Sequence, residues 1–203
     1  MTDTAQRFVD LGPDWMSAEM PSGYHNRVAE ILRLTADLEK LGRYGRLLTG
    51  SGPALAEIVR DLFSTLQVET ALLPGESSCD VSVRVPGRGR LLFHASSDTG
   101  TVAKKSGEIA AAFQLLHGTA DEQDRVVLVT NPDPNSRPSE RSASLADDAE
   151  TFVKRMGVNH VSGRTLFELW KLSLPEPEQA RAQLQRLLAH EGGTWELPAT
   201  ARA

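Results

Sequence analysis

The sequence predicts an α/β protein in which helices cover both faces of a mixed sheet, with a coiled-coil-like helix near the N-terminus. The run RVVLVT at residues 125–130 is apolar and β-branched over most of its length, which is typical of a strand covered on both faces. Three shorter strand-like stretches precede it, and helical segments alternate with the strands that follow. Successive strands can pair as an antiparallel meander, whereas strands joined by helical crossovers pair in parallel, so the sheet is expected to be mixed.

Composition narrows the classes of protein to consider. The chain has 203 residues, of which 40% are hydrophobic and 24% charged, which suits a compact domain with an appendage. The net charge of -5 disfavours non-specific nucleic-acid binding without excluding a local basic groove. Cys79 stands alone, so no disulfide can form within the chain. The N-terminus lacks the pattern of a signal peptide and no apolar run could span a bilayer, so we expect a cytoplasmic protein without membrane association.

The first part of the chain is expected to form an arm and a helix. Pro and Gly interrupt residues 1–23, which predicts a flexible arm. Residues 24–48 predict an amphipathic helix whose apolar side chains recur at alternating spacings of three and four, as in a heptad seam. The members of this stripe are Ile31, Leu34, Leu38, Leu41 and Leu48. So narrow a stripe can pack on its own domain or pair with a second copy, and we expect a homodimer through this helix.

Residues 49–203 are expected to form the α/β domain. Pro53 suits a first helical turn, and a broad apolar face then predicts a core helix over residues 54–66. Strands are predicted in VETALLP, CDVSVRVP, GRLLFHAS, RVVLVTN and GVNHVS, and further helices over residues 104–117, residues 147–156, GRTLFELWKLSL and EPEQARAQLQRLLAHEGG. The loop PDPNSRPSERSAS separates the fourth strand from the helix after it.

This order of elements resembles the core of the restriction-endonuclease-like superfamily, the PD-(D/E)XK nucleases, over roughly residues 47–170. The chain looks most similar to members that follow a short helical coil and begin with an LL..G..L helix, which RLLTGSGPALAEIVRDLFSTL matches here. TNPDPNSRPSER is similar to the N…P.eR loop of those domains, and SGRTLFELW resembles their junction between strand and helix. The resemblance implies the sandwiched mixed sheet and a site at the end of the second and third strands.

In that superfamily an aspartate and a (D/E)-x-K motif hold a divalent metal beside the scissile phosphate, often with a glutamate from the first helix. Carried over by position, Asp80 matches the aspartate and Glu57 the helix glutamate. His94 stands at the motif carboxylate, Ser96 at its lysine, and Gln114 where many members place a helical glutamine. The resemblance therefore implies a degenerate active site.

Two functions follow from this pattern. The first is a catalytically inactive nuclease-like domain that acts as a binding or assembly module, for which no cofactor is expected. The second is a divalent-metal-dependent nuclease with Mg²⁺ or Mn²⁺ on Asp80, Glu57 and His94, and with a displaced lysine from Lys104 or Lys105. We favour the first function, because His94 and Ser96 replace the carboxylate and lysine of the motif and the sequence shows no residue that clearly takes over their roles.

Each candidate residue also has a plainer interpretation. Asp80 can cap a turn, Glu57 can belong to a solvated helix face, and His94 can be an ordinary hydrogen-bonded histidine. A Ser-His-Asp arrangement of Ser96, His94 and Asp80 has no nucleophile elbow to support it. The candidates for contacts with nucleic-acid phosphates are Arg84, Arg88, Arg90, Lys104 and Lys105. The three arginines surround a hairpin, where a solvated turn is the commoner role.

Overall fold

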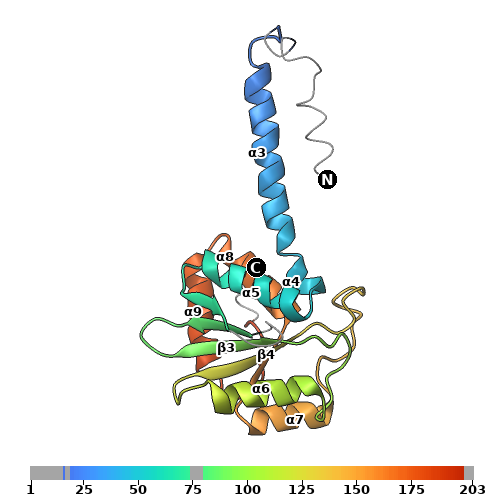
Figure 1. The fold of residues 1–203 in the computed structure, drawn as a ribbon, viewed down its shortest axis with the longest axis vertical. Coiled ribbons are helices and arrows are strands. Elements are labelled where there is room, and N and C mark those ends of the chain that lie inside the picture. Colours follow the sequence, from blue (N-terminus) through green and yellow to red (C-terminus); the bar gives the residue numbers. More distant parts are fainter. Residues whose placement is uncertain (1–15, 17–18, 74–79, 199–203) are drawn as a thin grey trace. The chain divides into compact units, whose positions relative to one another are not determined.

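The computed structural model describes residue 16, residues 19–73 and residues 80–198, and the chain divides into two units, Met1–Arg43 and Tyr44–Ala203. Most of the predicted arm over residues 1–23 lies outside the described residues, as does Cys79. Helices and strands carry the labels of Figure 1.

Helix α3 (Tyr24–Arg43) belongs to the first unit and contains no buried residue. Its predicted stripe is exposed, most of all Leu38, whose relative exposure is 68%. The helix ends short of the predicted residue 48, because Tyr44 and Leu47 are buried in the core of the second unit. The boundary between the units therefore follows Arg43 rather than residue 48. Across the described residues, none of the helices combines the length and apolar character that crossing a bilayer requires.

The second unit is built on a six-stranded sheet whose strands lie side by side in chain order. The first three strands pair antiparallel and the last three join them in parallel, which confirms the predicted mixed sheet. The strands are β1 (Thr70–Leu72), β2 (Asp80–Arg84), β3 (Arg90–Ala95), β4 (Arg125–Thr130), β5 (Asn159–Ser162) and β6 (Gly193–Thr194).

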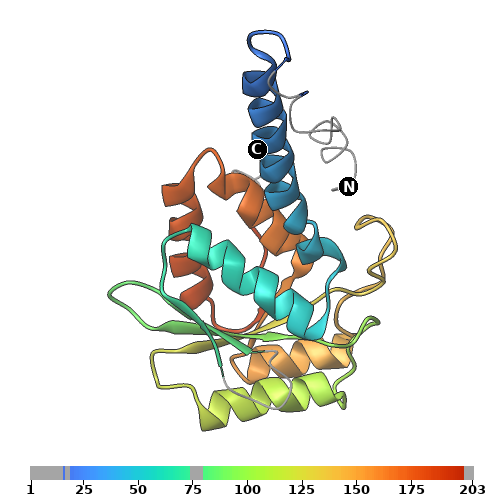
Figure 2. The ribbon, with the colours of Figure 1, turned by 45° about the horizontal axis from the view of Figure 1, so that its top comes forward.

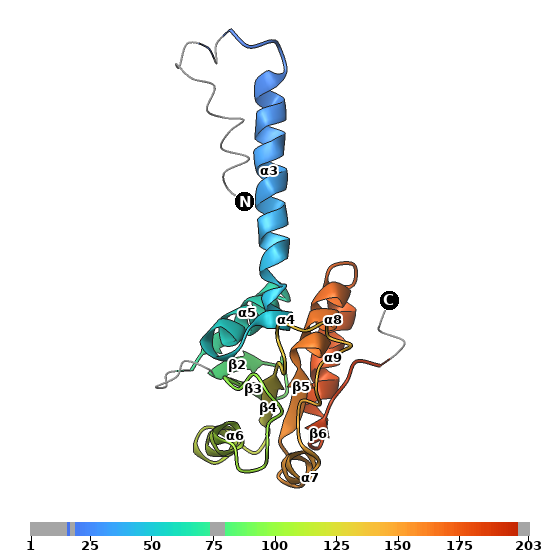
Figure 3. The same ribbon diagram turned by 90° about the vertical axis from the view of Figure 1, so that its right-hand side faces the viewer.

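Helices cover both faces of this sheet, as predicted, and divide the core in two (Figures 1 and 3). One face packs against α4 (Arg46–Thr49), α5 (Gly52–Thr65), α8 (Gly163–Ser173) and α9 (Pro177–Leu188), and the other against α6 (Gly107–Gly118) and α7 (Asp147–Arg155). On the α5 face, the rings of Phe63 and Phe93 stack with centroids 4.9 Å apart. On the α6 face, Leu92, Val126 and Leu128 pack with Ile109. Successive residues of β3 and β4 thus enter different cores, because strand side chains alternate in direction.

Two asparagines join segments that are distant in sequence. Asn131, directly after β4, donates from Nδ2 to the carbonyls of Leu47 and Gly50, both at 2.9 Å. Gly163 permits this clamp, since a Cβ there would lie 2.1 Å from both Asn131 Oδ1 and the Leu47 carbonyl oxygen. Asn159 donates to the Leu187 carbonyl at 2.9 Å and accepts from the Gly192 N–H at 2.9 Å.

The short strand β6 had no sequence signal. Its two residues follow Gly192, whose φ of 101° is a conformation that glycine adopts without strain. The strand forms because the turn after α9 is anchored to Asn159 and returns the chain to the free edge of β5. Figure 2 shows the red chain turning back after the last helix, and Figure 3 labels β6 near β5.

Val127 tests the placement of β4 between two helical layers. It is fully buried in the core that α5 also contributes to, so Val127→Asp would place an unpaired carboxylate there. We expect a loss of at least about 3 kcal/mol in the free energy of unfolding, measured by urea denaturation. The matched control is Leu174→Asp, at a side chain that is 58% exposed, which should change stability little. Equal stability of the two variants would contradict the central position of β4.

Candidate functional site

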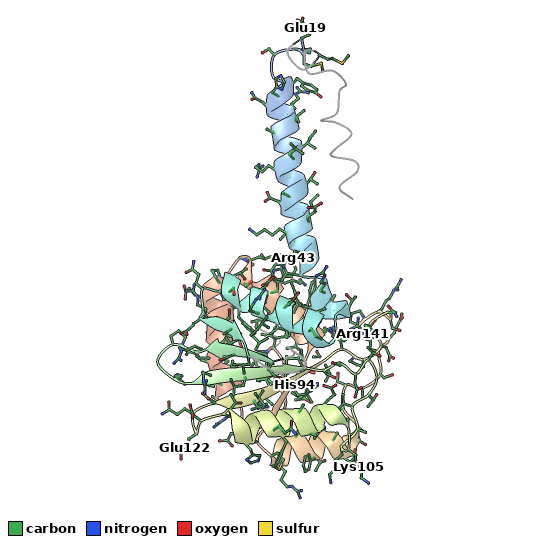
Figure 4. The ribbon with its side chains drawn as sticks, in the orientation of Figure 1. Glu19, Arg43, His94, Lys105, Glu122 and Arg141 are labelled. Atoms are coloured by element: carbon green, nitrogen blue, oxygen red, sulfur yellow. The ribbon has the colours of Figure 1, made fainter. Side chains whose placement is uncertain are left out.

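Asp80 and His94 meet because they pair across β2 and β3. Their neighbours Val81 and Phe93 enter the core on the α5 face, so the alternation of side chains turns Asp80 and His94 toward α6. In Figure 4 the labelled His94 lies at the sheet, above α6. The structure thus brings together two of the predicted site residues.

The His94 ring lies between two carboxylates. Its Nδ1 is 2.7 Å from Asp80 Oδ1, and its Nε2 is 3.0 Å from Glu108 Oε2 in the first turn of α6. The exposed fractions of the His94 and Glu108 side chains are only 7% and 14%. Ionised carboxylates only accept hydrogen bonds, so both contacts are satisfied at once when both ring nitrogens carry a proton. The geometry therefore favours an imidazolium.

The surroundings of His94 favour the same charge state. Burial lowers the pKa of His94, but the hydrogen bonds and charges of Asp80 and Glu108 outweigh it and raise the pKa to about 9. Burial raises the pKa of Glu108, whereas His94, the Ser97 N–H at 3.1 Å from Oε1 and the Ser96 hydroxyl together lower it below its usual range. At neutral pH the cluster holds one positive ring and accepting carboxylates.

These shifts make the cluster a pH-dependent source of stability. The pKa of His94 is higher in the folded chain than the ordinary 6.5, so its contribution is complete below about pH 6.5 and is lost as the pH rises through about 9. The pKa of Glu108 is lowered by folding, so its contribution is complete above its ordinary 4.5 and is lost as the pH falls through the folded value. The cluster therefore stabilises the fold most between about pH 4.5 and 6.5.

Two other predicted residues lie away from this cluster. Glu57 is exposed on α5, the helix on the opposite face of the sheet, so the expectation that it converges with Asp80 and His94 is wrong. Gln114 is exposed on α6, whereas Glu108 of the same helix makes the contact with His94. The sequence analysis missed Glu108, because an acidic residue in a first helical turn is commonly explained by the helix dipole.

A buried serine occupies the position predicted for a catalytic lysine. The Ser96 side chain is buried and its oxygen accepts from the Asp98 N–H at 3.1 Å. Lys104 Nζ lies over the Phe152 ring, 5.2 Å from its centroid, and Lys105 is exposed. In the described ranges, which omit residues 74–79, no group of three or more His, Cys, Asp or Glu side chains is arranged to hold a metal ion.

Comparisons of the chain with protein-family models, with curated proteins and with solved structures give no match. The likeness to PD-(D/E)XK nucleases thus stays an interpretation of the sequence. The chemistry of the Asp80–His94–Glu108 cluster is therefore inferred from its own residues.

The predicted phosphate-binding cations do not form one patch. Arg84 Nε lies 3.0 Å from Glu69 Oε2, and Arg90 Nη2 lies 2.6 Å from the buried Asp124 Oδ2. The hairpin of Arg84, Arg88 and Arg90 lies at the C-terminal end of α6, since Arg90 also donates to the Thr119 carbonyl. Lys104 and Lys105 precede the N-terminal end of this helix, which spans 12 residues, or about 18 Å. Figure 4 shows Lys105 and Glu122 at opposite ends of α6.

A second buried histidine lies in the same row of the sheet. The register joins His94 to Leu128, Leu128 to His160 and His160 to Thr194, all pointing to the α6–α7 face. His160 Nε2 is 2.9 Å from Thr130 Oγ1, and Nδ1 is 3.0 Å from Thr194 Oγ1. Burial lowers the pKa of His160 to about 4, so this ring is neutral at physiological pH.

The charge of His94 can be tested by His94→Gln, which keeps a polar side chain but removes the proton-binding ring. Below about pH 6.5 the variant should be less stable than the original chain, because two carboxylates lose their cation. That difference should shrink by roughly 3 kcal/mol as the pH rises through about 9. Urea denaturation across this range measures it.

The matched control for this experiment is His117→Gln, at an exposed histidine of α6. This change leaves Asp80, His94 and Glu108 in place, so the loss of their stabilising contribution as the pH rises through about 9 should persist. A stability difference between His94→Gln and the original chain that is constant over the range would contradict the imidazolium.

Proposed function

We propose that this chain is a catalytically inactive, nuclease-like binding or assembly module of the cytoplasm that dimerises through α3. The observation that carries the proposal is the His94 ring between Asp80 and Glu108. In the PD-(D/E)XK interpretation, Asp80 would be a metal ligand and His94 would replace another. Here an internal cation lies between the two carboxylates and hydrogen-bonds to both.

The contacts of His94 work against metal binding. Mg²⁺ prefers six oxygen ligands in octahedral geometry. To reach Asp80 and Glu108 together, the ion would have to displace a protonated ring and break two charge-assisted hydrogen bonds, which are about twice as strong as neutral ones. Ser96 supplies no positive charge for an attacking hydroxide. Both features support an inactive site over the alternative of a metal-dependent nuclease.

Nuclease assays test this part of the proposal. The unmodified chain should not cleave plasmid or single-stranded DNA with Mg²⁺ or Mn²⁺. The double variant His94→Glu with Ser96→Lys replaces the ring with a carboxylate and restores a lysine, so it should bind Mn²⁺ in calorimetry before it shows any activity.

The matched control pairs His94→Glu with Ser97→Lys, which places the lysine at the adjacent, exposed residue. It should bind Mn²⁺ without any gain of cleavage. Cleavage by the unmodified chain that Asp80→Ala abolishes would instead favour the metal-dependent nuclease, with Mg²⁺ or Mn²⁺ as its cofactor.

The surface of α3 supports the assembly part of the proposal. Ile31 and Leu38 occupy the a positions of a heptad, and Leu34 and Leu41 the d positions. All four side chains are exposed in the single chain. Ile at a with Leu at d favours two-stranded parallel coiled coils.

Charge favours the parallel over the antiparallel pairing of two α3 helices. Glu30 and Asp37 occupy the g positions, whereas the e positions hold the uncharged Val28, Thr35 and Gly42. Antiparallel helices would place g opposite g and bring the acidic side chains together, whereas parallel helices place g opposite e. We therefore propose a parallel homodimer.

Leu38→Glu tests the dimer, because it places a charge at the centre of the seam. The original chain should be a dimer at tens of micromolar by light scattering, and the variant a folded monomer. Ala36→Glu adds the same charge at the solvent-facing f position and should stay dimeric. An original chain that is monomeric at this concentration would refute assembly through α3.

A further inference from the structure

A cleft of about 870 Å³ opens where β4 and β5 end, on the side of the sheet row that holds His160. Its volume is within the range of small-molecule sites, and the carboxyl ends of parallel strands are where α/β sheets commonly bind ligands. Its walls come from the loop after β4, the start of α8 and the chain around β6. None of the nuclease-like candidate residues lines it.

Two arginines line this cleft. Arg141 is held in place by its own loop, donating from Nε to the Ser136 carbonyl at 3.1 Å and from Nη2 to the Pro134 carbonyl at 3.4 Å. Burial lowers the pKa of Arg141, and the charge of Asp133 offsets only part of this effect. A bound anion would therefore stabilise the charged guanidinium. In the described part of the chain, the side chain of Arg164, in the first turn of α8, makes no hydrogen bond or ion pair.

The remaining charged side chains of the cleft favour a polar ligand body. Lys171 Nζ is already paired with Glu168 Oε2 at 3.1 Å. The carboxylate of Glu150 also lines the cleft and can accept from ligand hydroxyls. Five hydroxyl side chains add donors and acceptors: Ser142, Ser144, Ser162, Thr165 and Thr194. The arginine side chains can bind an anionic group, and the hydroxyl and carboxylate side chains can hydrogen-bond to hydroxyl groups elsewhere on the same ligand.

The lining also argues against other ligands. Apart from the neutral imidazole of His160, no aromatic side chain is among the lining residues in the described part of the chain. A nucleobase or single-stranded nucleic acid would lack the stacking surface that such ligands commonly use. The apolar lining is limited to Pro132, Pro138, Ala143, Leu145 and Leu197, which is too little for a lipid or a large aromatic molecule.

We propose that this cleft binds a small phosphorylated polyol of the sugar-phosphate class, with its phosphate on Arg141 and Arg164 and its hydroxyls on the serine, threonine and carboxylate side chains. Planar guanidinium groups hold phosphate oxygens through paired N–H donors. The neutral ring of His160, fixed by Thr130 and Thr194, forms part of the lining without adding charge. The site is independent of the Asp80–His94–Glu108 cluster and of α3, so it goes beyond the proposed assembly role.

Thermal melting of the full chain with a panel of compounds tests the proposal, followed by calorimetry. The panel is ribose 5-phosphate, glucose 6-phosphate, inorganic phosphate, AMP and glucose, each at millimolar concentration. The two sugar phosphates should raise Tm most, inorganic phosphate less, and glucose not at all, because ligands that bind only the folded state stabilise it. AMP should bind no better than ribose 5-phosphate, since its base finds no stacking partner.

Variants locate the site. Arg164→Gln should weaken sugar-phosphate binding at least about tenfold and leave the Tm of the free chain unchanged, because its side chain is exposed. Arg141→Gln should weaken binding similarly, and Arg88→Gln, at the hairpin on the other end of β3, should not. No Tm shift with either sugar phosphate, tighter binding of AMP, or unchanged affinity in Arg164→Gln would overturn the proposal. The result is separable from the dimer and nuclease assays, which measure assembly and DNA cleavage and contain no small sugar phosphate.

Discussion

The alternating direction of side chains along β3, β4 and β5 is the constraint on which the rest of the second unit depends. Both faces of these strands are covered, so neighbouring residues such as Leu92 and Phe93 must satisfy two different cores. A shift of one residue in register would exchange these cores and place His94 among the apolar side chains of α5. The same alternation aligns Asp80, His94, Leu128, His160 and Thr194 in one row.

Two histidines in this row have opposite charge states because their neighbours differ. Both are nearly inaccessible to water, and burial alone favours the neutral ring. His94 has a carboxylate at each nitrogen and its pKa rises to about 9, whereas His160 has a threonine hydroxyl at each nitrogen and its pKa falls to about 4. His94 and His160 lie on either side of Leu128 in this row, yet the first ring is charged and the second is neutral. Burial by itself does not reveal the role of a histidine.

The proposed activities occupy separate parts of the chain. The heptad stripe lies on α3 in the first unit, whereas the His94 cluster and the cleft lie in the second. Within the second unit, the cluster joins β2, β3 and α6, and the cleft lies beyond β4, where Asn131 clamps the chain to residues 47 and 50. The His94 cluster and the cleft share no lining side chain, so a ligand in the cleft would not contact the cluster.

Local patterns in the sequence determined the elements and their order. The apolar run of β4, the alternation of Val81 and Val83 in β2, and Pro53 at the start of α5 each act within a few residues, so they are readable without the fold. The expected pairing of the second and third strands also brings Asp80 beside His94, as the register of β2 and β3 shows. The parallel pairing of the later strands followed from the helices between them.

Only the tertiary structure decided which side chains meet across long sequence separations. Glu108 reaches His94 from a helix that packs on the sheet, and the Arg90 guanidinium is neutralised by Asp124, 34 residues away, rather than left for a phosphate. The end of α3 at Arg43 depends on Tyr44 and Leu47 entering the core of the second unit. Strand β6 exists because Asn159 anchors the turn before it. Such contacts depend on how the helices pack on the sheet, and the spacing of apolar residues within one segment does not encode this packing.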